Sequence, residues 1–257
     1  MILICIIDKQ IYNLLKCTQV ATDKYKRVLL KLSGETFMGN RDFGIDPIFC
    51  QWLAHEIIKA QKHGTQIAVV VGGGNIFRGT SAEENGLERT VGDYIGMLAT
   101  IMNSLALQAA LEKEGQAARV LSAIDIKDVC EPYIRRRAIR HLEKERVVIF
   151  AGGTGNPYFT TDTTAALRAL ETKCEIILKA TKVDGVYDKD PKKHQGAIKF
   201  KNIKIKDALI DNNIEVLDNS ALSLCMEHNI PILVFDINVE DNIGKAVQGE
   251  LIGSLIS

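Results

Sequence analysis

The stretch from Val147 to Glu171, VVIFAGGTGNPYFTTDTTAALRALE, decides the fold of this chain. Its first four residues, Val147–Phe150, are apolar and predict a buried strand, while the spacing of apolar residues from Thr161 to Glu171 predicts a helix. Several glycines lie between the two. A strand, a glycine loop and a helix in this order are typical of an α/β sheet whose ligands bind beyond the carboxyl ends of its strands.

The same order recurs along the chain. Short apolar runs predict further strands at 28–32, 66–71, 119–122, 175–179 and 231–236, and amphipathic patterns predict helices at 46–62, 89–114, 133–144 and 220–228. We therefore expect an α/β three-layer sandwich, with a mostly parallel central sheet and helices on both faces. The helix at 89–114 is apolar enough to serve as core or as a subunit interface, and core is the default expectation.

Composition excludes several classes of protein. The chain has 257 residues, with 32 basic and 32 acidic side chains and a formal net charge of zero, so it lacks the global basic field of a nucleic-acid-binding protein. The apolar run Met1–Ile7 is too short to cross a membrane, and no signal-peptide cleavage site follows it. We expect a cytoplasmic protein with an N-terminal extension at 1–24 and one domain at 25–257.

The six cysteines form no C-x-x-C pair and are widely and irregularly spaced. This pattern fits neither a zinc site nor the disulfide framework of a small secreted protein. We expect reduced and mostly buried thiols.

Three predicted strands end in loops suited to phosphate groups. These loops are Lys31-Leu32-Ser33-Gly34, Gly72-Gly73-Gly74-Asn75 and Gly152-Gly153-Thr154-Gly155-Asn156. Glycines let backbone N–H groups approach an anion, and a following helix N-terminus adds a favourable dipole. Lys31 would either snorkel from an edge strand or face the ligand crevice, and we favour the crevice. Asp162 fits a helix N-cap, which would still lie beside the chemistry.

Familiar catalytic motifs are missing. Gly74–Ser81 has the glycine spacing of a Walker A loop without its lysine, and no G-x-G-x-x-G follows the first predicted strand. The five histidines show no ligand spacing, and the chain has no G-x-S-x-G or H-E-x-x-H motif. The residues therefore predict neither a protein metal site nor a catalytic histidine.

Five stretches carry a family resemblance: YKRVLLKLSGE (25–35), VVVGGGNIFRG (69–79), VGDYIGMLATIMN (91–103), GGTGNPYFTTDTTAALRA (152–169) and LKATKVDGVYDKDP (178–191). With these the chain resembles the bacterial uridylate (UMP) kinases of the amino acid kinase superfamily. The resemblance runs from Tyr25 to about Ile256. The first and last stretches are shared loosely across the superfamily, and the middle three are more specific to UMP kinases.

The resemblance implies transfer of the γ-phosphate of magnesium-bound ATP to UMP, with Lys31, Arg78 and Asp162 as the catalytic residues. On the ATP side it implies contacts from Lys31, Leu32, Ser33, Gly34, Gly74, Arg78, Thr181, Tyr187 and Asp190. On the UMP side it implies contacts from Gly73, Asp93, Thr154, Gly155, Asn156, Pro157, Tyr158, Phe159, Thr160 and Thr161. The attacking UMP phosphate oxygen is already anionic, so the reaction needs no general base.

The resemblance also implies a cytoplasmic homohexamer that GTP activates and UTP inhibits. The stretch matching the one linked to GTP activation is Gly39, Asn40, Arg41, Asp42, Phe43 and Gly44, and Arg119 and Arg146 match further effector positions. Gln108 and Glu112 depart from the effector pattern.

Two rival functions remain open. One is a superfamily kinase that phosphorylates a carboxylate, as acetylglutamate kinase does, but such an acceptor lacks the ribose that would explain Asp93 and the 156–161 loop. The other is a non-catalytic nucleotide- or oxyanion-binding protein on the same fold. The presence of Lys31, Arg78 and Asp162 together argues against it. We expect no membrane or nucleic-acid partner.

Overall fold

The computed structural model describes residues 25–77, 86–191, 193–194, 196–211, 214 and 216–257. The predicted extension at 1–24 and Arg78 lie outside these ranges. A nine-stranded sheet forms the centre, in the order β4-β3-β5-β2-β1-β6-β10-β11-β9. Its strands are β1 (Arg27–Leu32), β2 (Gln66–Val71), β3 (Ala118–Ser122), β4 (Glu131–Pro132), β5 (Val147–Ala151), β6 (Ile176–Thr181), β9 (Asn202–Ile203), β10 (Ile232–Asp236) and β11 (Ser254–Ile256).

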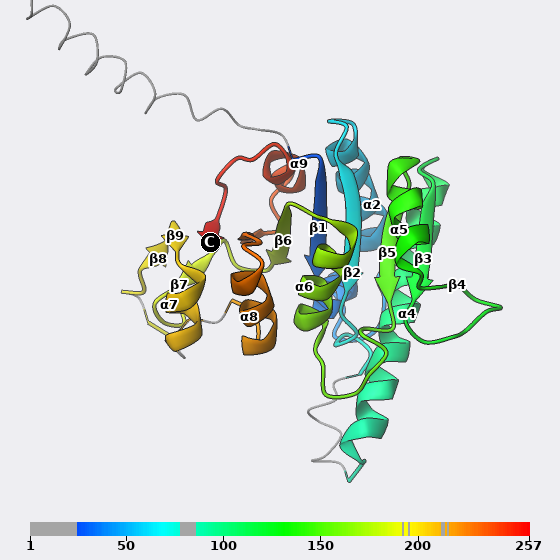
Figure 1. Ribbon diagram of the computed structural model, residues 1–257, viewed down its shortest axis with the longest axis horizontal. Coiled ribbons are helices and arrows are strands. Elements are labelled where there is room, and N and C mark those ends of the chain that lie inside the picture. Colours follow the sequence, from blue (N-terminus) through cyan, green and yellow to red (C-terminus); the bar gives the residue numbers. More distant parts are fainter. Residues whose placement is uncertain (1–24, 78–85, 192, 195, 212–213, 215) are drawn as a thin grey trace, which may run out of the picture.

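The pairing is parallel except between β10 and β11. A separate antiparallel pair, β7 (Val186–Tyr187) and β8 (Lys199–Phe200), lies near the edge of the sheet that β9 forms (Figure 1). Mostly parallel pairing confirms the predicted fold class, because parallel strands need crossover connections that place helices on the sheet faces.

Helices cover both faces of the sheet (Figure 1). One core contains residues of α2 (Pro47–Gln61), α4 (Arg89–Lys113) and α9 (Asn242–Val247). The other contains residues of α5 (Arg135–Glu143), α6 (Thr161–Thr172), α7 (Ile205–Ile210) and α8 (Asn219–Glu227). A short 3-10 helix, η1 (Gly34–Met38), follows β1.

The alternation of side chains along β1 explains the two cores. Val28, Leu30 and Leu32 pack in the α2–α4 core, whereas Leu29 packs in the α6–α8 core. Successive side chains of a strand point to opposite faces, so Lys31 lies on the face of Leu29, under α6. The edge-strand alternative for Lys31 is wrong, because β1 is the middle strand of the sheet and Lys31 is buried.

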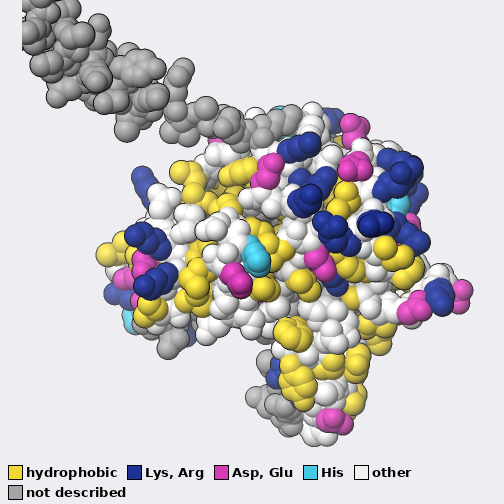
Figure 2. Space-filling model, viewed as in Figure 1, with side chains coloured by type: hydrophobic (Ala, Val, Ile, Leu, Met, Phe, Trp, Pro, Cys, Tyr) yellow, Lys and Arg dark blue, Asp and Glu magenta, His cyan; other side chains and the backbone are white. Residues whose placement is uncertain are grey.

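The long helix α4 is less buried than the default expectation of a core helix requires. It buries a row that includes Met97, Ile101 and Leu107, but a second row of large apolar side chains is exposed: Val91, Tyr94, Leu98 and Met102. Its N-terminal part projects from the body and carries hydrophobic side chains on its surface (Figure 2). By length and composition α4 is the one helix among the described residues that could cross a membrane, but half of its most apolar window is buried in the protein, which makes this weak evidence.

Candidate active site

Two lysines and one aspartate form an ion-pair cluster at the centre of the sheet. Lys31 on β1 and Lys179 on β6 are partners in the parallel register. Asp162, in the first turn of α6, lies over them, with 2.5 Å from its Oδ1 to Lys31 Nζ and 3.1 Å from its Oδ2 to Lys179 Nζ. Lys179 Nζ also donates to the carbonyl oxygen of Val216. Two amino groups therefore share one carboxylate in a largely dry setting, which suits an anionic ligand.

Burial and charge shift the pKa values of this cluster. Burial raises the pKa of Asp162, but the two nearby ammonium groups outweigh it and hold that pKa below its usual value of 3.8. Burial lowers the pKa of Lys179, and the neighbouring Lys31 adds to this, against the opposing pull of Asp162. Asp162 is thus a carboxylate at neutral pH, a partner for the lysines rather than a proton acceptor.

Thr160 caps helix α6. Its Oγ1 accepts hydrogen bonds from the backbone N–H groups of Asp162 and Thr163, so the expectation that Asp162 is the N-cap is wrong. Because Asp162 is free of the capping role, its carboxylate can reach the lysines. Thr160 Oγ1 also donates to Asp218, which itself caps α8. Asp218 therefore ties the start of α6 to the start of α8.

A pocket of about 430 Å³ lies beside Asp162 and Lys179. It is lined by Asp162, Lys179, Thr181, Val183, Gly185, Ala208, Asp211, Ile214, Val216, Leu217, Asp218, Asn219 and Val234. Of the nine residues expected on the ATP side, Thr181 is among its described lining residues, whereas Lys31, Leu32, Ser33, Gly34 and Gly74 are not. Tyr187 and Asp190 are not among its described lining residues, and the Tyr187 hydroxyl donates to Asp184 instead.

The two N-terminal glycine loops meet backbone to backbone. A Cβ atom added to Gly34 would lie 2.4 Å from the backbone nitrogen of Gly74, and one added to Gly72 would lie 2.7 Å from the nitrogen of Gly34. Real Cβ atoms do not approach this closely, so glycine is required for the contact. The predicted ATP-side residues Leu32, Ser33, Gly34 and Gly74 are thus brought together at the ends of β1 and β2.

A smaller pocket, of about 130 Å³, lies on the other side of the start of α6. It is lined by Gly73, Phe77, Gly92, Asp93, Gly96, Met97, Thr100, Gly153, Phe159, Thr160 and Thr161. Five of the residues predicted for the UMP side are among them: Gly73, Asp93, Phe159, Thr160 and Thr161. Thr154, Gly155, Asn156, Pro157 and Tyr158 lie in the connecting loop and are not among the described lining residues.

Asp93, on α4, holds the loop that connects β5 to α6. Its carboxylate accepts from Arg89 Nε at 3.0 Å and from the backbone N–H of Tyr158 at 2.8 Å. Tyr158 has a φ of +70°, an uncommon backbone for a residue with a side chain, and its ring lies 6.0 Å from the Arg89 guanidinium. A carboxylate has about four acceptor positions, so Asp93 retains capacity for a ligand hydroxyl group.

The predicted effector residues form two groups: the 39–44 segment, and Arg119 with Arg146, which Glu131 and its neighbour His141 connect. Gly39 and Asn40 line a separate pocket of about 310 Å³ with Asp46, Phe49 and Trp52 among others. Arg119 pairs with Glu112 and Glu131, while Arg146 lies beside His141 at 3.0 Å. Arg41, Asp42, Phe43 and Gly44 follow Asn40 in the same exposed connection, and Gly44 reaches back to Asn75.

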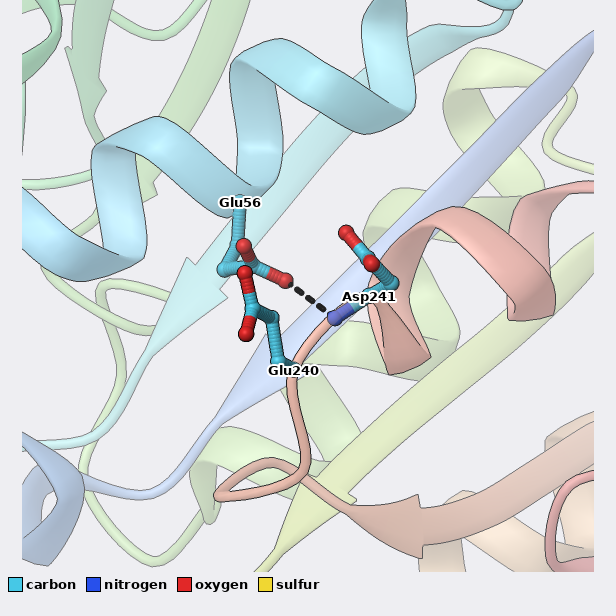
Figure 3. Close-up of side chains that lie close together, drawn as sticks. All are labelled: Glu56, Glu240 and Asp241. Carbon is cyan, nitrogen blue, oxygen red and sulfur yellow. Dashed lines mark hydrogen bonds between the residues drawn. The ribbon is translucent and has the colours of Figure 1, made fainter.

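Three carboxylates elsewhere come close enough together to suggest a metal site: Glu56, Glu240 and Asp241 (Figure 3). Lys59 pairs with all three, at 3.0 to 3.1 Å, and Glu56 Oε2 also accepts from the backbone N–H of Asp241. The group lines neither of the two pockets at α6. Its charge is already partly balanced by Lys59, and we read it as a brace between α2 and α9.

Sequence reasoning did not single out Lys179 or Asp218. Lys179 gave a usable signal, since it is the second lysine near the end of an apolar strand and repeats the pattern of Lys31. The sequence around Asp218 indicates only a helix cap. Its hydrogen bond with Thr160 joins residues 58 positions apart, so no local pattern reveals it.

Comparisons with known proteins agree with this geometry. The amino acid kinase family model matches residues 26–236. A UMP kinase structure from Bacillus anthracis is 39% identical, with a TM-score of 0.87, and the match covers 91% of this chain and 96% of that one. One from Ureaplasma parvum is 40% identical, with a TM-score of 0.85, covering 90% and 98%. A uridylate kinase from Archaeoglobus fulgidus is 31% identical, with a TM-score of 0.68, covering 90% and 99%.

Proposed function

This chain belongs to the amino acid kinase family, and from that premise we propose that it is a nucleoside monophosphate kinase that transfers the γ-phosphate of ATP to UMP. One observation carries the proposal. The first turn of α6 borders both pockets, because Asp162 lines the larger and Thr160 and Thr161 line the smaller. The Lys31–Asp162–Lys179 cluster therefore lies at the junction where a donor and an acceptor phosphate would meet.

The larger pocket suits ATP and the smaller one UMP. The Ser33–Gly34 loop and Gly73–Gly74 would offer backbone N–H groups to the phosphates, and Lys31 and Lys179 would neutralise charge on the moving phosphoryl group. The N-terminus of α6 adds its dipole at the same point. Asp93 would accept hydrogen bonds from the ribose hydroxyls of UMP, and the loop at 154–161 would close over the uracil ring.

The donor set fits direct in-line transfer without a proton acceptor. The described residues lining the two pockets include no histidine. The carboxylate of Asp162 is held by two lysines, so magnesium would arrive on the phosphates of ATP rather than in a protein cage. Asp162 would orient the two ammonium groups. Arg78, the third catalytic residue implied by the resemblance, stays a prediction.

For assembly and control we propose a cytoplasmic homohexamer, with GTP as activator and UTP as inhibitor. The exposed apolar row of α4, made of Val91, Tyr94, Leu98 and Met102, supports self-association, because a helix face this apolar seldom stays in water. The assignment of Gly39–Gly44, Arg119 and Arg146 to effector binding stays a prediction.

One assay separates the candidate functions. ADP release from the purified chain is measured with ATP and magnesium in the presence of UMP, CMP, dUMP or N-acetylglutamate. We expect turnover with UMP above all others. Turnover with N-acetylglutamate alone would indicate a carboxylate kinase, and turnover with none, together with tight nucleotide binding, would indicate a binding protein.

A further inference from the structure

Two buried asparagines, Asn75 and Asn103, hold each other by a reciprocal amide pair. Asn75 Nδ2 donates to Asn103 Oδ1 at 2.9 Å, and Asn103 Nδ2 donates to Asn75 Oδ1 at 2.7 Å. Asn75 is 2% exposed and Asn103 is fully buried. Asn75 ends the glycine loop after β2, and Asn103 lies in the middle of α4. The pair therefore joins the loop to the helix that carries Asp93.

The remaining N–H groups of the pair reach two further backbone segments. Asn103 Nδ2 donates to the carbonyl of Gly72 at 2.7 Å, and Asn75 Nδ2 donates to the carbonyl of Gly44 at 2.9 Å. The backbone N–H of Gly44 in turn donates to the carbonyl of Asn75 at 3.0 Å. Both amide groups thus use both of their N–H donors. In a buried network of this kind, losing one partner leaves another group unsatisfied.

The pair also lies against the donor-side loop. A Cβ atom on Gly34 would come within 2.9 Å of Asn75 Oδ1, so the amide and the Ser33–Gly34 loop are in direct contact. Gly73, between the two hydrogen-bonded ends of its loop, lines the acceptor pocket. Neither asparagine is among the described lining residues of that pocket or of the donor pocket. Their placement suits residues that act through the loops rather than on substrate.

We infer that Asn75 and Asn103 are a positioning pair that sets the spacing between the Ser33–Gly34 loop and the Gly72–Gly74 loop. The inference rests on the proposed kinase function, in which these loops hold the donor and acceptor phosphates. In-line transfer requires the reacting groups to be held closely, and a displacement of about 1 Å can lower the rate about 100-fold. Through Gly44 the same pair also holds the 39–44 segment against the two loops. A displacement of this segment would therefore shift the loops, and a displacement of the loops would shift the segment.

The first test is steady-state kinetics of Asn103→Ala and Asn75→Ala with UMP and ATP. We expect kcat to fall about 10- to 100-fold in both, with a smaller change in the KM for either nucleotide, since the loops lose alignment rather than contacts. Ser104→Ala is the matched control. Ser104 is the next residue of α4 and is fully buried, and among the described residues its hydroxyl bonds within its own helix, to the carbonyl of Thr100 at 2.7 Å. We expect it to keep kcat within about twofold.

A double-mutant cycle tests whether the two asparagines act as one unit. The Asn75→Ala, Asn103→Ala double variant should be hardly slower than either single variant, because the first substitution already breaks the pair. Kinetics are compared well below the melting temperature of every variant. A fall in melting temperature with kcat unchanged would overturn the inference and leave a structural role. Additive losses in the double variant would overturn the pair as a unit.

Hydrogen exchange supplies a readout that does not depend on turnover. In Asn103→Ala, the backbone amides of Gly44 and of residues 72–77 should exchange faster than in the wild-type chain, while the exchange of the β5 amides is unchanged. If Asn103→Ala folds poorly, Asn75→Ala is measured in its place. Unchanged exchange at Gly44 would overturn the link to the 39–44 segment. A wild-type chain without UMP turnover would contradict the proposed function, and the exchange measurement would still decide the inference.

Discussion

Lys31 and Lys179 are register partners on the neighbouring parallel strands β1 and β6, and both ammonium groups pair with one carboxylate. Two like charges held side by side in the middle of a sheet are unfavourable by themselves. Asp162 offsets this repulsion in part, and an incoming phosphate group would offset the rest. The arrangement is therefore poised for an anionic ligand, and it gives the first two predictions.

Lys31→Ala should lower kcat for UMP phosphorylation by about 10²- to 10³-fold, because it removes one preorganised donor to the moving phosphoryl group. Lys179 would still pair with Asp162, so we expect the variant to fold. The measurement is the ADP-release assay. Lys127→Ala, which removes an exposed lysine that pairs with Asp125 in the described part of the chain, is the control. Near wild-type turnover in Lys31→Ala would contradict the catalytic role.

Asp162→Asn should reduce the free energy of unfolding by about 3–5 kcal/mol at neutral pH, because it removes the carboxylate that pairs with the buried Lys31 and the partly buried Lys179. The folded-state pKa of Asp162 lies below 3.8, so its stabilisation is complete above that pH and is lost as the pH falls through the lower folded value. Urea unfolding at pH 7 and pH 3 should therefore show the difference between wild type and variant narrowing in acid. A difference that stays constant with pH would refute the ion-pair account.

Asp93→Asn should raise the KM for UMP about tenfold or more, while the KM for ATP changes little. The carboxylate would bind the ribose hydroxyls, and it also holds the backbone of Tyr158, so the amide weakens both the direct contact and the loop. Initial rates with each nucleotide varied in turn give both constants. If the KM for ATP rises instead, the donor and acceptor sides are reversed.

Cys50, Cys174 and Cys225 should resist alkylation in the folded protein. All three are buried, and burial raises the pKa of the Cys50 thiol to about 11 and those of Cys174 and Cys225 to about 12. The reactive thiolate is therefore scarce at pH 8. Mass spectrometry after brief iodoacetamide treatment should find these three unmodified and, of the four cysteines that the structure describes, the partly exposed Cys130 modified first. Rapid labelling of Cys174 would show that the sheet opens locally.

Leu98→Glu should lower the molecular mass measured by light scattering after gel filtration, because it places a charge in the exposed apolar row of α4. Lys206→Glu, at an exposed position of α7 on the other face of the sheet, should leave the mass unchanged. A wild-type chain that elutes as a monomer would contradict the proposed hexamer, whatever the variant does.

Much of the architecture followed from local patterns. The apolar runs at 28–32 and 147–150 and the glycine loops after them predicted the strands, their parallel order and the edge of the sheet where ligands bind. The helix at 161–171 was placed within a residue of its observed end. These features depend on neighbours in the chain, which is why a single sequence carries them.

The charges of the site depended on the tertiary structure. Lys179 became Lys31's neighbour because β6 pairs with β1 rather than with β5, which precedes it in the chain. Asp218 joined the site across 58 residues through Thr160, and only the assembled structure shows which row of α4 stays exposed. The sequence by itself determined which residue types could meet a phosphate, since glycine loops and strand-end lysines are local features. Which of them share one carboxylate was decided by strand order, because contacts between distant segments exist only once the sheet is assembled.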